Sequence, residues 1–166
     1  KRGGVIIKTT DGGASWSKVH ASTASSLNAL CISDSGTGWS VGTTGMLLET
    51  ADHGTTWNSR SKGVSGAITS VYFMDPDTGW TIASGLIYRT TDGGENWTAG
   101  RRPVLEDPRL ANFSFHSLHF TGRDTGIVTG SYILQSSTMF EMASVILRTF
   151  DGGSTWTTER RQDYEY

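Results

Sequence analysis

The sequence predicts an all-β fold, a β-propeller-type array of four-stranded antiparallel blades with three full blades and a half blade. The first observation is an octet, Thr-x-Asp-x-Gly-x-x-Trp, that occurs four times in the chain. Its aspartates, Asp11, Asp52, Asp92 and Asp151, are spaced 41, 40 and 59 residues apart. The second observation is the composition, with 21 glycines and 36% hydrophobic residues, which suits short strands joined by turns. A period near 40 residues is typical of propeller blades.

Each repeat unit contains four β segments in chain order. An apolar first strand leads into a turn of Asp, Gly, Ser and Thr, residues that favour tight turns. Second and third strands follow, the octet forms a hairpin turn, and the fourth strand begins at its Trp. First strands are expected at 27–32, 68–73 and 117–120, second strands at 39–42, 80–83 and 127–130, and third strands at 5–9, 46–50, 86–90 and 145–149. We interpret 1–166 as one domain, with a half blade at 1–20 and blades at 21–60, 61–100 and 101–166.

The octet has mechanical reasons for its residue types. Its Asp can accept backbone N–H groups that the turn leaves without ladder partners. Its second Gly is present in every copy, which indicates a positive φ or a close backbone approach. Its Trp can bury a large apolar surface between blades. Four equivalent copies cannot all face one substrate, so we interpret these residues as structural: Asp11, Gly13, Trp16, Asp52, Gly54, Trp57, Asp92, Gly94, Trp97, Asp151, Gly153 and Trp156.

Two further tryptophans, Trp39 and Trp80, follow the turn between the first and second strands. Stacking on a sugar is one interpretation of such residues. The third unit has Ile127 at the same position. An aliphatic replacement favours packing between blades, because only the apolar character is shared.

Composition and charge argue against several classes of function. The formal net charge of −2 provides no basic surface for nucleic acid. No apolar run is long enough to cross a membrane, and no signal peptide is recognisable in this chain. The single cysteine, Cys31, reads as a small core residue. His116 and His119 are three apart on an expected strand and point to opposite faces, so we expect no metal site and no cofactor.

The octets resemble the Asp-box (BNR) repeat of sialidases, sortilin-type receptors and xyloglucanases. The longer runs 38–50 and 78–90, each leading into its octet, resemble the photosystem II stability/assembly factor-like propellers. The resemblance covers nearly the whole chain, in three units and a part. It implies a propeller whose boxes are structural turns away from the active face. It also implies an assembly or stability role in an extracytoplasmic compartment.

The chain departs from that family in its number of blades. The family forms a closed seven-bladed ring about twice as long. Here the sequence starts at a third strand, and a half blade leaves backbone groups unpaired at its edge. We therefore expect either a piece of a longer propeller or a homo-oligomer whose copies close each other's edges.

The last unit carries two extra stretches, at 100–115 and 131–144. Alternating strand directions place both on the face opposite the boxes, where function is usual for long loops on a rigid scaffold. Arginine, aromatic and acidic side chains in them suit a protein or peptide partner, although solvated loops with incidental charges are an equal alternative. The candidate binding residues are Arg101, Arg102, Glu106, Asp107, Arg109, Tyr132, Gln135, Phe140 and Glu141.

The alternative function is a carbohydrate-binding or sialidase-like glycoside hydrolase module. Hydrolysis needs two carboxyl groups flanking the scissile bond, for which Glu106, Asp107 and Glu141 are the candidates. Adjacent Glu106 and Asp107 do not provide the required opposition. The Arg-Ile-Pro signature of sialidases is also missing, because Arg101-Arg102-Pro103 is not equivalent to it. The preferred prediction is a non-catalytic scaffold.

Overall fold

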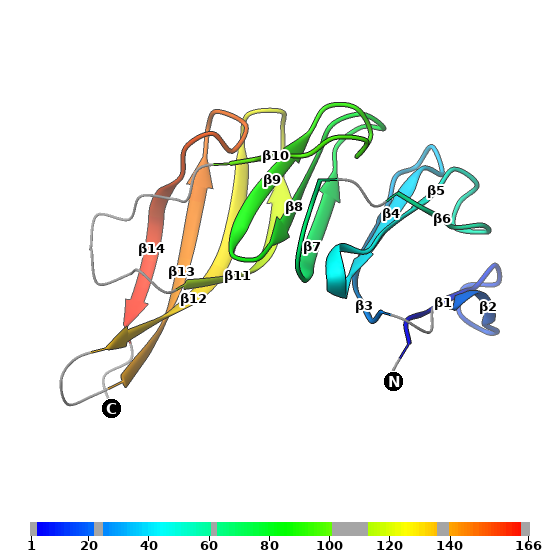
Figure 1. Ribbon diagram of the computed structural model, residues 1–166, viewed down its shortest axis with the longest axis horizontal. Helices are drawn as coiled ribbons and strands as arrows, with labels where there is room; N and C mark the ends of the chain where they lie inside the picture. The colour runs from blue at the N-terminus through cyan, green and yellow to red at the C-terminus, as the bar shows by residue number, and fades with distance from the viewer. Residues whose placement is uncertain (1–2, 22–24, 61–62, 101–112, 136–139, 164–166) are drawn as a thin grey trace.

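A computed structural model of the chain describes residues 3–21, 25–60, 63–100, 113–135 and 140–163 (Figure 1). Regular structure in these ranges is β, apart from one 3-10 turn at Thr43–Gly45. The sheets follow one another along an arc, so the molecule has the outline of an arch (Figure 1). The expectation of an all-β, propeller-type array is confirmed.

The described strands form one two-stranded sheet and three four-stranded sheets. The half sheet contains β1 (Val5–Lys8) and β2 (Ser17–Ala21). The first full sheet contains β3 (Leu27–Ile32), β4 (Gly38–Gly42), β5 (Leu47–Thr50) and β6 (Asn58–Ser59). The second contains β7 (Ile68–Phe73), β8 (Gly79–Ala83), β9 (Leu86–Thr90) and β10 (Thr98–Ala99). The last contains β11 (Phe113–Phe120), β12 (Gly126–Gln135), β13 (Phe140–Thr149) and β14 (Thr157–Asp163).

Each full sheet pairs its strands antiparallel and in chain order, as blades of a propeller do. The first strands of successive sheets lie beside one another. The Asn28 amide donates to Ile68 O at 2.7 Å, and the Leu118 N–H donates to Ser70 Oγ at 3.3 Å. The first strands therefore form one edge of the arc and the fourth strands the other.

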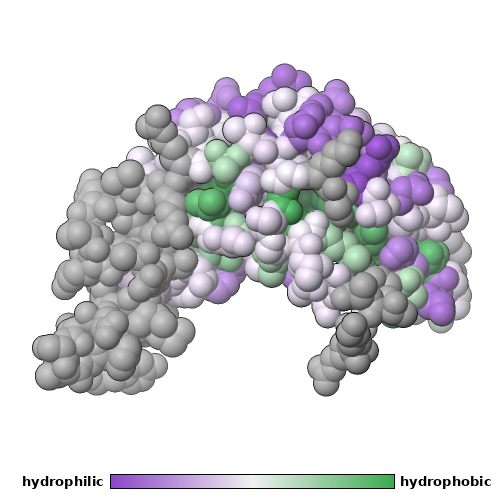
Figure 2. Space-filling view, in the orientation of Figure 1, coloured by the Kyte–Doolittle hydropathy of each residue, from purple (hydrophilic) through white to green (hydrophobic). Residues whose placement is uncertain are grey.

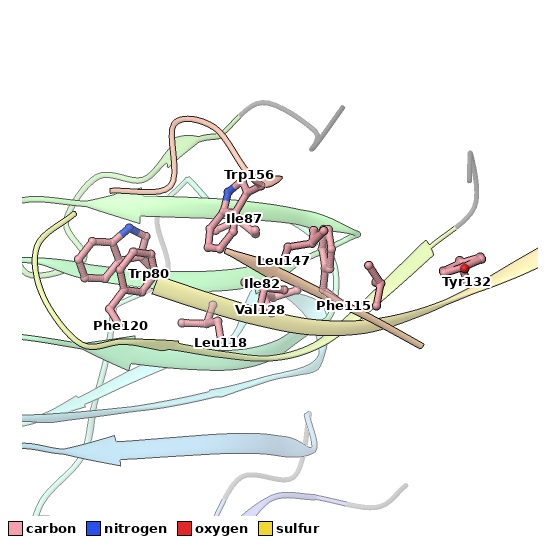
Figure 3. Packing of buried hydrophobic residues seen from close by; sticks show 11 residues of the cluster. Trp80, Ile82, Ile87, Phe115, Leu118, Phe120, Val128, Tyr132, Leu147 and Trp156 are labelled. Atoms are coloured by element: carbon pink, nitrogen blue, oxygen red, sulfur yellow. The ribbon is translucent and has the colours of Figure 1, made fainter. Parts of the chain in front are cut away.

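The core lies between facing sheets rather than inside any one of them. Trp80 of β8 stacks on Phe120 of β11 with ring centroids 3.7 Å apart, and Trp156 meets Phe120 edge-on at 6.0 Å (Figure 3). Ile82, Ile87 and further aliphatic residues complete this cluster. An equivalent cluster joins the first and second full sheets around Trp39 and Phe73, whose rings stack at 3.4 Å. Burial of these rings supplies much of the stability of each junction, since aromatic side chains carry the largest apolar areas.

The last sheet corrects one expectation. We expected a long loop at 131–144, but β12 and β13 continue as a paired ladder as far as Gln135 opposite Phe140. Tyr132, Ile133 and Phe140 are the strand-favouring residues on these extended strands. Tyr132 consequently lies on a strand and is 1% exposed, within the core cluster and not on the exposed loop surface that we expected.

A second correction concerns Trp16. We expected every box Trp to be buried, and Trp57, Trp97 and Trp156 are 4–9% exposed. Trp16 is 57% exposed. It belongs to the two-stranded sheet, which has no first or second strand among the described residues to cover the indole.

Candidate functional site

The four box turns share one hydrogen-bonded core, built on the threonine that opens the octet. In every copy this hydroxyl donates to the Asp carboxylate at 2.7–2.8 Å. It also accepts the N–H of the second Gly at 2.9–3.0 Å. Sequence reasoning did not assign a role to these threonines, although their presence in all four copies was the available signal. They are Thr9, Thr50, Thr90 and Thr149.

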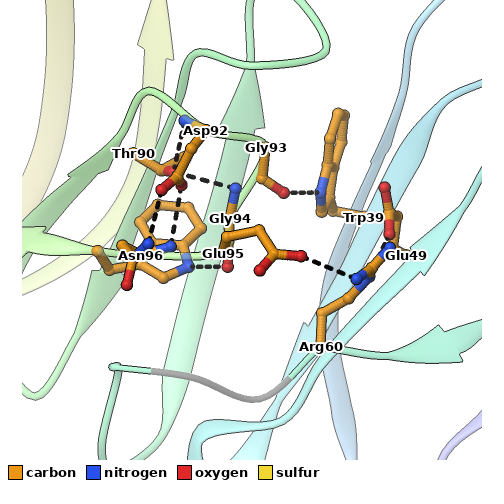
Figure 4. Close-up of polar contacts among 10 residues, drawn as sticks. Trp39, Glu49, Arg60, Thr90, Asp92, Gly93, Gly94, Glu95 and Asn96 are labelled. Atoms are coloured by element: carbon orange, nitrogen blue, oxygen red, sulfur yellow. Dashed lines mark hydrogen bonds and ion pairs between the residues drawn. The ribbon is translucent and has the colours of Figure 1, made fainter.

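The box aspartates are hydrogen-bond acceptors for their own turn. The residue four positions later binds one carboxylate oxygen through its N–H and the other through its side chain, as Asn96 does for Asp92 at 2.9 and 2.8 Å (Figure 4). The Ser15 hydroxyl and N–H, with the Thr9 hydroxyl, lower the pKa of Asp11 to about 2. Burial raises the pKa of Asp151, but hydrogen bonds from Thr155 and Thr149 outweigh it and the net pKa is about 2. Ionised, fully engaged carboxylates of this kind suit a structural role.

The glycines of the box have the backbone conformation expected of them. Gly13, Gly54, Gly94 and Gly153 have φ between 77° and 96°, in the left-handed region. A Cβ at Gly153 would lie 3.4 Å from the Trp156 ring and 3.5 Å from Trp80 Nε1. The preceding position is also left-handed, but His53 occupies it in the second copy with φ 56°. The first position has φ of 56–70°, which a side chain such as that of His53 can adopt, whereas the φ of 77–96° at the second position favours Gly in every copy.

A tryptophan latch joins each full sheet to the next one. Trp39 Nε1 donates to Gly93 O at 3.3 Å, and Trp80 Nε1 donates to Gly152 O at 2.9 Å (Figure 4 shows the first). Both indoles are 0% exposed. The expectation of packing between blades is confirmed for these two residues, and neither indole is open to a sugar. We call the junction of the first and second full sheets seam one, and that of the second and last full sheets seam two.

At the end of the last sheet away from its box, a two-stranded extension emerges. Strand β11 pairs with β12 only as far as Tyr132, and β14 pairs with β13 only as far as Ala143. Three rungs continue beyond these neighbours, Ile133 to Met142, Leu134 to Glu141 and Gln135 to Phe140. Within the described residues, the outer backbone edges of both strands have no neighbouring strand there. We call the described residues 133–135 and 140–142 the hairpin extension.

The candidate binding residues divide into three groups. Arg101, Arg102, Glu106, Asp107 and Arg109 lie outside the described residues, so their assignment stays a prediction. The backbones of Gln135, Phe140 and Glu141 belong to the hairpin extension. Tyr132 lies at its base and is buried.

The described residues contain no cluster of three metal-binding side chains. His116 Nε2 lies 2.8 Å from Ser131 Oγ, whereas the His119 ring packs edge-on against Tyr72. These two histidines therefore have separate partners. In the part of the chain that is described, no helix is long and apolar enough to span a bilayer.

The comparisons with known proteins agree with this architecture. The family model for the BNR/Asp-box repeat matches residues 88–99, which form the third box and its flanking strands. A solved structure described as YCF48 bound to D1 peptide is similar with 27% identity and a TM-score of 0.58 over 82% of this chain. YCF48 from Cyanidioschyzon merolae is similar with 27% identity and a TM-score of 0.63 over 90% of this chain. This chain covers 40% and 44% of those two proteins, less than half of their length.

A GH74 enzyme from Niastella koreensis is also similar, with 17% identity, a TM-score of 0.59 and coverage of 93% of this chain and 34% of the enzyme. At that identity the likeness concerns the fold alone. No curated protein matches the chain at the sequence level. The chain thus contains a BNR/Asp-box repeat and has a propeller-type fold similar to that of YCF48.

Proposed function

We propose that this chain is a non-catalytic propeller scaffold that binds a peptide segment of a protein partner, in an assembly or stability role. The binding surface is the end of the last sheet that carries the hairpin extension and the start of β11. The observation that carries the proposal is the pair of backbone edges on that extension that have no neighbouring strand among the described residues.

Open strand edges are chemically suited to a peptide. Each edge presents N–H and C=O groups that an added strand can pair with, while side-chain contacts set the choice of sequence. Native proteins usually cover or charge such edges, because they also template unwanted association. The other full sheets have third strands of four and five residues and no comparable extension among their described residues. The extension is therefore specific to one place in the array.

The similarity to YCF48 supports the same class of ligand. One of the two similar YCF48 structures is described as bound to D1 peptide, so a related propeller accepts a peptide. The arginines and acidic residues at 101–109 precede β11 in the sequence. The first residue of β11, Phe113, pairs with Tyr132 at the base of the extension. We assign Arg101 and Arg102 to the same surface, where they would pair with acidic groups of the partner.

The experiment uses the D1 peptide as the probe and compares the full chain with a shortened variant. Replacing residues 133–142 by Asn-Gly joins Tyr132 and Ala143, which already face each other in the ladder, through a two-residue hairpin turn. We expect the shortened variant to bind roughly tenfold more weakly or worse, an affinity loss of about 1.4 kcal/mol. Arg101→Ala combined with Arg102→Ala should also weaken binding, with nearly unchanged thermal stability.

Arg123→Ala is the matched control, because Arg123 is exposed at the opposite, box end of the same sheet. Its binding should equal that of the parent chain. Unchanged affinity of the shortened variant, or failure of the parent chain to bind the peptide, would overturn the proposal. Turnover of a fluorogenic sialoside that Glu141→Gln abolishes would replace it with the hydrolase alternative.

Two parts of the proposal concern the wider setting of the chain. We propose an extracytoplasmic location, on the basis of the family resemblance. We also propose that a second copy or another propeller segment covers the open end of the array, where Val5, Ile7, Leu30 and Ile32 are exposed large apolar side chains. The mass in solution tests the second copy: a dimer supports it, and a strict monomer at high concentration contradicts it.

A further inference from the structure

Seam one and seam two are equivalent in their inner packing but differ at their outer edge. In seam one, Arg60 follows β6 and links its own sheet to the next. Its Nε lies 2.6 Å from Glu49 Oε2, and its Nη1 lies 2.9 Å from Glu95 Oε1 (Figure 4). One guanidinium therefore bridges two carboxylates on facing sheets and closes the edge.

The equivalent three positions of seam two cannot make this bridge. Counted from the box aspartates, Glu49 corresponds to Arg89, Arg60 to Gly100 and Glu95 to Ser154. The bridging guanidinium is lost, both carboxylates are lost, and a guanidinium stands where one carboxylate was. The charge three residues before the box Asp therefore changes from negative at Glu49 to positive at Arg89.

A pocket of about 460 Å³ occupies the outer edge of seam two. Its walls include Arg89, Gly100 and Ser154, together with the apolar Ile87, Tyr88 and Ala99. A Cβ at Gly100 would lie 2.8 Å from Ile87 O. The lack of a side chain at Gly100 therefore lets its backbone lie close to that of β9. The pocket is thus lined by the three residues whose counterparts form the Arg60 bridge in seam one.

Arg89 is the charged group of this pocket. Its guanidinium carbon lies 5.6 Å from the centroid of the Trp80 ring, a cation-π contact. Its Nε is buried and has no hydrogen-bond acceptor among the described residues. Asp92 is the acidic residue of the same wall, but its carboxylate is engaged by Thr90 and Asn96 inside the turn. The buried Nε itself is out of a ligand's reach, so a ligand in the pocket would pair with the other N–H groups of this half-buried guanidinium.

We propose that the pocket at Arg89 binds a carboxylate of a peptide, either an acidic side chain or a C-terminal carboxylate. Planar guanidinium groups pair with carboxylates through two parallel hydrogen bonds. In seam one the same edge already holds two carboxylates against a guanidinium, although the guanidinium comes from Arg60 and a carboxylate stands at the position of Arg89. Ile87, Tyr88 and Ala99 accommodate the methylene groups beside the carboxylate. The site is distinct from the hairpin extension and does not depend on it.

The test follows the Arg89 Nε–H and Trp80 Nε1–H resonances while small peptides are added. The probes are acetyl-Gly-Glu-amide, acetyl-Gly-Gly with a free carboxylate, and acetyl-Gly-Gln-amide as the neutral control. We expect saturable shifts of both resonances with at least one acidic probe and none with the neutral probe. The two acidic probes distinguish a side-chain carboxylate from a C-terminal one.

Two variants make the test specific. Arg89→Gln should weaken binding roughly tenfold or more. Arg89→Glu should abolish binding of the acidic probes, because it replaces the guanidinium with a carboxylate. The variant with the shortened hairpin should bind the acidic probes unchanged, which separates this site from the proposed function. Equal shifts with the neutral probe, or no shift with millimolar acidic probes, would overturn the proposal.

Discussion

The half sheet and the three full sheets contain the same turn in different surroundings. In all four boxes the Thr hydroxyl, the Asp carboxylate and the left-handed Gly make the same hydrogen bonds. The Trp indole also donates to the Gly carbonyl at 3.1 Å in each copy. Yet Trp16 is 57% exposed, whereas Trp156 is 4% exposed. The turn is therefore a local structure, and burial of its Trp depends on strands and sheets elsewhere in the chain.

A second difference lies in how each box is tied to its sheet. In the full sheets the N–H at the first Gly position donates to a carbonyl of the turn between the first and second strands, at 2.8–2.9 Å. His53 binds Gly36 O, Gly93 binds Asp77 O and Gly152 binds Asp124 O. The half sheet lacks those two strands among its described residues.

Hydrophilic residues gather along the convex side of the arch (Figure 2), which is the side where the full-sheet boxes lie in Figure 1.

Removing the Trp80 latch of seam two should deprive the last sheet of the packing against a preceding sheet that the half sheet also lacks. Trp80→Ala removes the ring that stacks on Phe120 and the donor to Gly152 O. We expect a loss of about 3–5 kcal/mol in the free energy of unfolding, measured by urea denaturation. Trp80→Phe keeps most of the apolar area and should cost only about 1–3 kcal/mol, through the unpaired carbonyl. A loss below about 1 kcal/mol for Trp80→Ala would show that the seam does not depend on this ring.

Alanine at the second Gly separates the local cost of the turn from the cost of packing. Gly13 and Gly153 both have positive φ, so each substitution carries a backbone penalty of about 1–2 kcal/mol. At Gly13 the new methyl would approach only the Trp16 ring, at 3.9 Å. At Gly153 it would lie at ordinary van der Waals distance from Trp156 and Trp80, 3.4 and 3.5 Å away. Because neither methyl is crowded, thermal or urea unfolding should show Gly13→Ala and Gly153→Ala to be destabilising by similar amounts, within about 1 kcal/mol, and a much larger loss at Gly153 would reveal a packing cost.

Acid titration should show the two regions behaving alike. The pKa of Asp11 and that of Asp151 are both about 2 in the folded chain, below the ordinary value of 3.8. Because the unfolded chain takes up protons first as the pH falls, these groups stabilise the fold above about pH 4. That contribution decreases between about pH 4 and pH 2. Carboxyl NMR shifts should give similar midpoints for both residues. A midpoint near 3.8 for Asp11 alone would mean that its turn is not formed without a full sheet.

The sequence allowed the repeated parts of the fold to be predicted with their residue ranges. The predicted bounds match the structure for the first strands at 27–32 and 68–73 and for the third strand at 86–90. Apolar runs define the first strands, and the octet marks the end of the third strand. The inter-blade role of Trp39 and Trp80 was also predictable from the substitution by Ile127. These features depend on local residue preferences that recur in every unit.

Features that depend on distant contacts were not predictable in the same way. Residues 131–144 looked like a loop because no other unit has the extra length, but the described residues 131–135 and 140–144 pair with each other and extend the ladder. Trp16 is exposed because its sheet has only two described strands. The pocket at Arg89 is lined by residues that differ in charge and size from their counterparts in seam one. In the sequence, the pocket at Arg89 is indicated only by comparing equivalent positions across units, such as Glu49 with Arg89.

The most direct measurement compares Trp97→Ala with Trp16→Ala by urea unfolding under the same conditions. Both residues close the same turn through the same hydrogen bond to a Gly carbonyl. We expect Trp97→Ala to cost about 3–5 kcal/mol, because the ring packs edge-on against Phe73 in the core of seam one. Trp16→Ala should change the free energy of unfolding by no more than about 0.5 kcal/mol. Equal losses for the two variants would contradict the conclusion that the turn is local and that neighbouring sheets supply the stability of each box.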